Sequence, residues 1–163
     1  MALEECPGCG VRLPAFDGPV HRYIESSPSC WAAYGEVLAR EYGDPAYMAN
    51  HRLTVDAYAV QHPGRPSPQS IQSVAAHLIS QHAVLELRSS QSQATRLIGR
   101  CVERLRFEWL EPPAERGAIV VTHVLATDSA ESHDKAVRTW AEAAWSAWAV
   151  HHARVRAWAK QAF

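Results

Sequence analysis

Hydrophobic positions recur at helical spacing along most of this chain, and three similar signals mark where helices begin. Each signal is a capping side chain followed by a proline, a pair that suits the first turn of a helix. The three are Ser27-Pro28, Asp44-Pro45 and Ser67-Pro68. The helices predicted from these signals and from the apolar pattern span about 28–42, 45–61, 68–88, 94–107 and 130–161. The predicted fold class is therefore mainly α, a helical bundle.

The last predicted helix carries an apolar stripe that must be covered. Its members lie within about 80° of one another when successive residues are placed about 100° apart. They are Val137, Trp140, Ala144, Trp148, His151, Val155 and Trp158. We interpret the stripe as core. Neighbouring arginines would also allow base stacking on the tryptophans, but regular helical spacing is more typical of packing, so nucleic acid is not favoured as a partner.

Residues 119–125, with the sequence IVVTHVL, are the one segment that favours a strand. The segment is short and rich in β-branched side chains. A lone strand needs a partner, and no second segment of this kind can be identified. One short β element near 119–125 is therefore an expectation without a pairing.

Composition narrows the class of protein. The chain has 163 residues with 47% hydrophobic side chains, enough for one compact domain. Its 16 Lys and Arg nearly balance its 17 Asp and Glu, so no overall field draws it to nucleic acid or to a membrane surface. The N-terminus lacks the features of a signal peptide, and a cytoplasmic location is expected. We expect a zinc-binding knuckle over 1–30, packed on a bundle over 28–163 as a single domain overall.

The strongest chemical signal is the pair Cys6 and Cys9. A two-residue spacer made of Pro7 and Gly8 lets both thiolates point at one ion from a tight turn. A redox pair is the alternative, but redox CxxC motifs are typical of a helix start after a strand, whereas glycines and prolines follow here. Half of a structural zinc site is the favoured interpretation.

Cys30 and His21 are the expected third and fourth zinc ligands. Cys30 follows Ser27-Pro28 and so lies in the first turn of a helix, where free N–H groups and the helix dipole stabilise a thiolate. The fourth position stays open between His21, His51, His62 and a water molecule. Cys101 lies in a helical stretch and is interpreted as a small core side chain.

A second group of polar residues falls inside the predicted bundle. Asp56 lies on an apolar helix face, and a buried carboxylate needs a partner. If the second and third helices form an antiparallel hairpin, Asp56 lies opposite His77, and His51 lies opposite His82. Asp56, His62 and His77 are therefore candidate catalytic residues, as an acid/base group or a second metal site. A buried pair that fixes helix register is the competing interpretation, and no helix shows the ligand spacing that a second metal requires.

Five segments of the chain resemble the DUF5946 family of small bacterial proteins of unknown function. The segments are CPGCG, SPSCWAAYGEVLAREY, LTVDAYAVQHPG, SIQSVAAHL and AWAVHHARVRAW. Together they span nearly the whole chain and include Cys6, Cys9, Cys30, Asp56, His62 and His77. The resemblance implies relatives but no reaction.

Two functions follow from these residues. The favoured one is a small zinc-binding helical protein that acts by binding a protein or small-molecule partner, with a homodimer as one form of partnership. The alternative is a metal-dependent or acid/base enzyme that acts on a small molecule through Asp56, His62 and His77. The Cys6 and Cys9 pair as a redox or metal-sensing element is a third interpretation.

Overall fold

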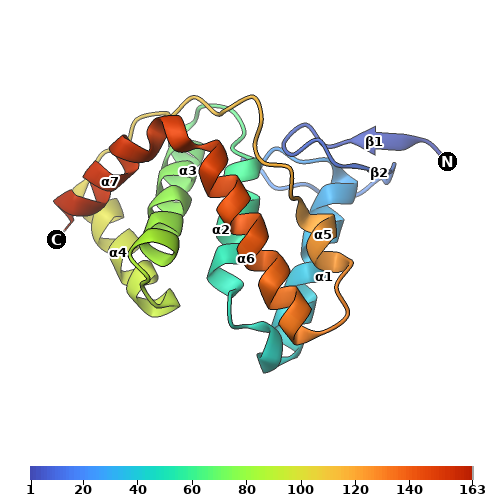
Figure 1. Ribbon diagram of the computed structural model, residues 1–163. Coiled ribbons are helices and arrows are strands. Elements are labelled where there is room, and N and C mark those ends of the chain that lie inside the picture. The colour runs from blue at the N-terminus through green and yellow to red at the C-terminus, as the bar shows by residue number, and fades with distance from the viewer. Residues whose placement is uncertain (163) are drawn as a thin grey trace.

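Helices form most of the chain in the computed structural model, which describes residues 1–162 (Figure 1). The α-helices are α1 (Pro28–Gly43), α2 (His51–Gln61), α3 (Pro68–Gln81), α4 (Gln91–Arg104), α5 (Val121–Leu125), α6 (Ala130–Ala147) and α7 (His152–Gln161). A two-stranded antiparallel hairpin, β1 (Leu3–Glu5) with β2 (Arg12–Pro14), precedes them. The mainly helical fold class is thereby confirmed. No helix within residues 1–162 is long and apolar enough to cross a membrane.

Helices α2 and α6 lie side by side at the centre of the molecule (Figure 1). Helix α3 packs on α2 and is itself covered by α4 and α7, while α1 packs against α5. The N-terminal hairpin projects at the end where α1 begins, far from the C-terminus. The hairpin contacts α1 through β2 and lies beside the residue that follows α2.

The predicted helix starts are confirmed where the capping side chain bonds as expected. Ser27 Oγ accepts from the Cys30 backbone N–H at 3.1 Å, and Ser67 Oγ accepts from that of Ser70 at the same distance. Asp44 instead caps only a single 3-10 turn, η1 (Pro45–Tyr47). Helix α2 starts at His51, six residues after Pro45. The prediction of one helix over 45–61 is therefore wrong in its first part.

Two predicted helices are interrupted. Helix α3 ends at Gln81 and continues as a π-helical turn, η2 (His82–Glu86). The final helix divides at Trp148, where α6 gives way to a short 3-10 turn, η3 (Ala149–His151), before α7. The division lets α7 fold onto α3 and α4, which a straight helix over 130–161 could not reach (Figure 1).

The prediction of a short β element near 119–125 is wrong, because most of this segment is helical. Its residues 121–125 form α5, and the His123 ring accepts from the Val120 backbone N–H at 3.0 Å. Val121 and Val124 are buried where α5 packs between α1 and α6. Burial between the two helices outweighs the β preference of the side chains.

The tryptophans of α6 form the centre of the core, as predicted. Trp140 and Trp148 are fully buried, and both indole N–H groups are satisfied. Trp140 donates to Gln61 Oε1 at 2.8 Å and Trp148 donates to the Val60 carbonyl at 3.0 Å. These bonds join α6 to the last turn of α2 and so fix the position of the residue that follows, His62.

Candidate metal centre

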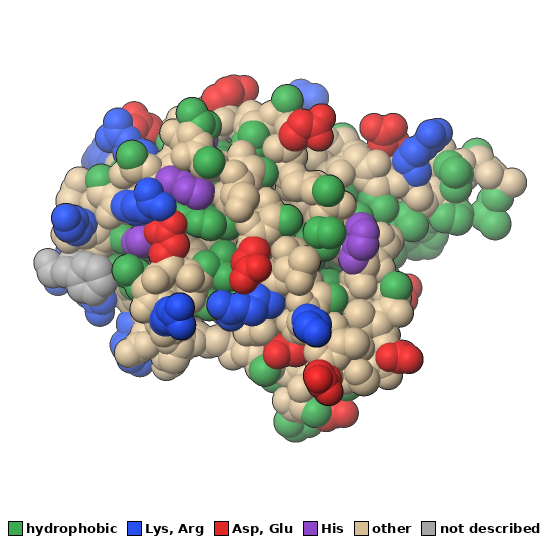
Figure 2. Space-filling view, in the orientation of Figure 1, with side chains coloured by type: hydrophobic (Ala, Val, Ile, Leu, Met, Phe, Trp, Pro, Cys, Tyr) green, Lys and Arg blue, Asp and Glu red, His purple; other side chains and the backbone are tan. Residues whose placement is uncertain are grey.

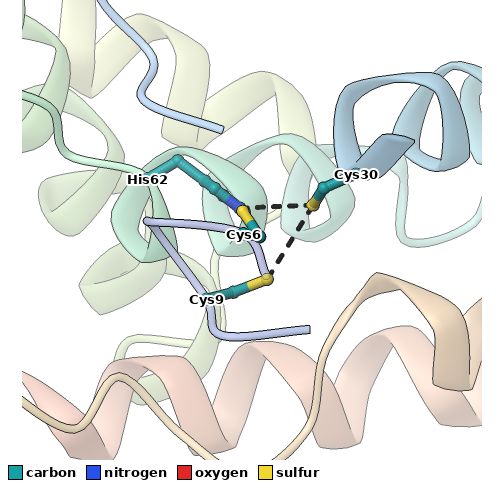
Figure 3. A group of neighbouring side chains, drawn as sticks. All are labelled: Cys6, Cys9, Cys30 and His62. Carbon is teal, nitrogen blue, oxygen red and sulfur yellow. Dashed lines mark hydrogen bonds between the residues drawn. The ribbon is translucent and has the colours of Figure 1, made fainter. Parts of the chain in front are cut away.

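Four side chains from three parts of the chain converge beneath the N-terminal hairpin (Figure 3). Cys6 and Cys9 come from the loop between β1 and β2, Cys30 from the first turn of α1, and His62 from the residue after α2. One ligand atom of each lies within 4.8 Å of all the others. This group could hold a metal ion.

The hairpin loop aims both of its cysteines at the same point. The Cys6 backbone N–H donates to the Val11 carbonyl at 2.8 Å, and the Gly10 N–H donates back to the Cys6 carbonyl at 2.9 Å. Gly10 has a φ of 78°, in the left-handed region that glycine adopts without strain. The resulting tight turn places the two thiols on the face that looks toward the helices.

Cys30 is held in place by its helix. It is completely buried, and its Sγ lies 3.8 Å from Cys9 Sγ and 3.5 Å from His62 Nε2. The Tyr58 hydroxyl also donates to Cys30 Sγ at 3.4 Å. The N-terminal end of α1 adds a positive partial charge near this sulfur.

His62 occupies the fourth position because Pro63 follows it. A residue before proline is pushed out of helical geometry, and His62 has φ −127° and ψ 57° at the end of α2. Its Nδ1 lies 2.6 Å from the Tyr58 carbonyl oxygen, which can only accept. Nδ1 therefore carries the proton, and Nε2 presents its lone pair to the cysteines. A carbonyl that fixes the tautomer in this way is typical of metal-ligating histidine.

His21, the ligand expected from the sequence, lies outside the group. Its ring packs edge-on against Tyr23 at 4.4 Å between centroids and tilted against Trp31 at 5.5 Å. The structure thus brings together Cys6, Cys9 and Cys30 of the expected set and completes the group with His62, which the sequence offered as an alternative. Cys101 is buried elsewhere, as predicted, with its Sγ near the Trp158 carbonyl.

The pKa values of the three thiols depend on one another, because each thiol affects the ionisation of its neighbours. Hydrogen bonds from Cys30 and Cys9 hold the pKa of Cys6 far below its ordinary value, and His62 adds to this effect against burial. Cys30, which supplies a proton to these bonds and is buried, has a pKa far above its ordinary value. Cys30 also lowers the pKa of Cys9, but Cys6 and burial outweigh it and raise that pKa to about 12. A divalent cation removes this dependence because it stabilises all three thiolates together.

Gly8 provides a test of how closely the hairpin fits the helices. A Cβ at this position would lie 2.3 Å from the His62 ring and 2.6 Å from the Glu25 carbonyl oxygen. We expect Gly8→Ala to lower the free energy of unfolding by about 1–3 kcal/mol, the usual cost of overpacking, as measured by urea denaturation.

Gly35→Ala is the matched control for this substitution. Gly35 lies inside α1, and nothing would come within 4 Å of its added Cβ. This variant should gain about 0.5–1 kcal/mol because alanine is the better helix former. If Gly8→Ala were as stable as the unsubstituted protein, the close contact between hairpin and His62 would be refuted.

The other candidate residues lie in three separate places. Asp56 is bonded to His77 at 2.8 Å, as the hairpin geometry predicts, but His62 is not part of that pair. His51 does not face His82. Its Nδ1 lies 2.8 Å from Glu41 Oε1, whereas the Nδ1 of His82 lies 2.7 Å from Glu86 Oε2. The π-helical turn at η2 places Glu86 there, and Arg156 holds its pKa down to about 2.

Sequence reasoning missed Glu41 altogether. This carboxylate is buried between helices and accepts from Thr54 at 2.7 Å, and its two oxygens lie 2.8 Å from nitrogens of His51 and His133. Glu41 stands near the end of α1, where a glutamate is expected to be solvated. Its partners come from α2 and α6, so no local signal could have identified it.

The fold and the cluster together define a small helical protein whose N-terminal hairpin carries half of a Cys3His group able to hold a metal ion. Comparison with family models then identifies the relatives: the chain belongs to DUF5946, a family of unknown function, whose model matches residues 4–149. The matched stretch includes all four members of the group. Comparisons with curated proteins and with solved structures gave no match.

Proposed function

We propose that the protein binds one zinc ion through Cys6, Cys9, Cys30 and His62, and that the ion has a structural role. The convergence of these four ligand atoms within 4.8 Å carries the proposal. Three thiolates and one imidazole are a donor set that zinc prefers and that hard cations such as magnesium do not.

Two distances within the group match the edges of a tetrahedral site. Zinc–sulfur bonds of about 2.3 Å and zinc–nitrogen bonds of about 2.0 Å require sulfur–sulfur edges of about 3.8 Å and sulfur–nitrogen edges of about 3.5 Å. Cys9 Sγ and Cys30 Sγ are 3.8 Å apart, and Cys30 Sγ and His62 Nε2 are 3.5 Å apart. Both separations are those of ligands that share one ion.

The number and origin of the ligands support a structural role. Four protein ligands complete a tetrahedral shell and leave no position for a substrate, as in structural zinc sites. The ligands also belong to the hairpin, to α1 and to the end of α2, so an ion that binds all four ties the hairpin to the bundle. The 1–30 segment then depends on the ion for its place on the helices.

A protein with a closed metal site is proposed to act by binding a partner. The hairpin end that the ion fixes exposes several large apolar side chains, among them Leu3, Phe16 and Val20. Hydrophobic side chains gather at this end of the face shown in Figure 2, whereas acidic and basic side chains are interspersed over the helices. This distribution supports a protein or small-molecule partner over nucleic acid.

Elemental analysis of the purified protein tests the metal directly. We expect one zinc per chain, lost in Cys6→Ser because three ligands bind zinc far more weakly than four. Zinc should be retained in Asp56→Asn and in Cys101→Ala, which leave the group intact. A metal-free protein with Cys6 and Cys9 joined in a disulfide would overturn the proposal and favour the redox interpretation.

A further inference from the structure

A second polar group lies on the opposite side of α2, away from the cysteines. Its centre is Asp56, whose side chain is completely buried. Ser80 Oγ donates to Asp56 Oδ2 at 2.5 Å, while Oδ1 accepts from His77 Nδ1 at 2.8 Å and from Arg52 Nη2 at 3.1 Å. Three donors therefore surround this one carboxylate.

The bond to Asp56 decides which nitrogen of His77 carries the proton. An ionised carboxylate can only accept, so the Nδ1 of neutral His77 must donate. The lone pair then lies on Nε2, for which the described residues supply no hydrogen-bond partner. The His77 side chain is 18% exposed and lines a hollow at the surface.

Arg52 has an unused edge beside the same ring. Its Nε and Nη2 bond to Asp56, and Nη2 lies 3.5 Å from His77 Nδ1. Nη1 has no partner within residues 1–162, and the side chain is 22% exposed. A guanidinium edge of this kind binds carboxylates with two parallel hydrogen bonds.

Both groups line one hollow of about 330 Å³ between α3 and α4. Gln72 and Ser73 add hydrogen-bonding groups to its wall, and Ile98 and Val102 add an apolar side. A volume of this size suits a small metabolite. The hollow therefore combines a hydrogen-bond acceptor, a cationic donor edge and an apolar wall.

We propose that this hollow binds a small hydroxycarboxylic acid, with its carboxylate on Arg52 and its hydroxyl donating to His77 Nε2. A simple carboxylate satisfies Arg52 but offers no proton to the Nε2 lone pair. A neutral hydroxy compound satisfies His77 but leaves the guanidinium edge unpaired. A molecule that carries both groups on neighbouring carbons matches both, because the two side chains are already in contact through Asp56.

Nuclear magnetic resonance of the protein labelled with nitrogen-15 in histidine tests this inference. The probes are lactate, propionate, which lacks the hydroxyl, and lactamide, which lacks the charge. We expect lactate to shift the His77 Nε2 resonance in a saturable way, and the other two to bind about tenfold more weakly, the usual effect of losing one hydrogen bond. No response to lactate, or equal responses to all three probes, would overturn the proposal.

Variants separate recognition from a purely structural network. Arg52→Gln should abolish the lactate response, while Arg138→Gln, which removes an exposed arginine on α6, should leave it unchanged. Asp56→Ala removes the acceptor that holds the proton on His77 Nδ1, so the proton should redistribute toward Nε2, a change visible in the nitrogen-15 shifts without any ligand. Persistence of the lactate shift in Arg52→Gln would show that the arginine only supports Asp56. The titration of the unsubstituted protein decides the proposal even if a variant does not fold.

Discussion

Cys30→Ala is expected to lower the free energy of unfolding by more than about 3 kcal/mol, because the binding energy of a structural zinc ion is folding energy. Cys101→Ala is the matched control, since Cys101 is an equally buried cysteine outside the metal group. Its loss should be about 1 kcal/mol, the cost of a small cavity. Urea denaturation followed by circular dichroism measures both values.

A chelator provides the second arm of this experiment. Removal of the ion should bring the unsubstituted protein down to the stability of Cys30→Ala and leave Cys30→Ala itself unchanged. Cys101→Ala should respond to the chelator as the unsubstituted protein does. Equal losses in the two cysteine variants, with no effect of the chelator, would mean that Cys30 stabilises the fold only by packing.

Glu41→Gln is expected to cost about 3 kcal/mol of stability, in the range found when one partner of a buried charged network is removed. The side chain of Glu41 is completely buried, and its two oxygens face His51, His133 and Thr54. An amide accepts at only one of its two terminal atoms, so His51, His133 and Thr54 can no longer all donate to this side chain.

Glu36→Gln is the control for this second prediction. Glu36 lies on the same helix but is exposed, so its replacement should change the stability by less than about 0.5 kcal/mol. Urea denaturation at neutral pH gives both values. If Glu41→Gln were as harmless as Glu36→Gln, the network would not be holding α1 against α2 and α6.

The helix starts could be predicted because the signals are local. The hydroxyls of Ser27 and Ser67 each accept from a backbone N–H three residues later, and the Ser-Pro pairs in the sequence indicate these caps. The interruption at Trp148 could not be predicted in this way. It arises because α7 packs on α3 and α4, a contact between segments far apart in the chain.

The metal group was predictable in part for the same reason. Cys6, Cys9 and Cys30 follow from a motif and a helix start, but the choice between His21 and His62 depends on where α2 ends relative to the hairpin. The pair of Asp56 and His77 could be predicted because an antiparallel helix hairpin fixes which residues lie at the same depth. The role of Glu41 could not be predicted, since its partner His133 comes 92 positions later.

The position of His62 in the chain also sets the order in which the protein assembles. His62 follows Cys6 by 56 positions, so the full group closes a long loop, whereas Cys6 and Cys9 alone close a very short one. The loop closes cheaply only after α1 and α2 have packed and brought Cys30 beside His62. A zinc ion held by all four ligands would therefore be acquired late, by a chain whose helices are already in place, and its supply would govern when the N-terminal hairpin docks.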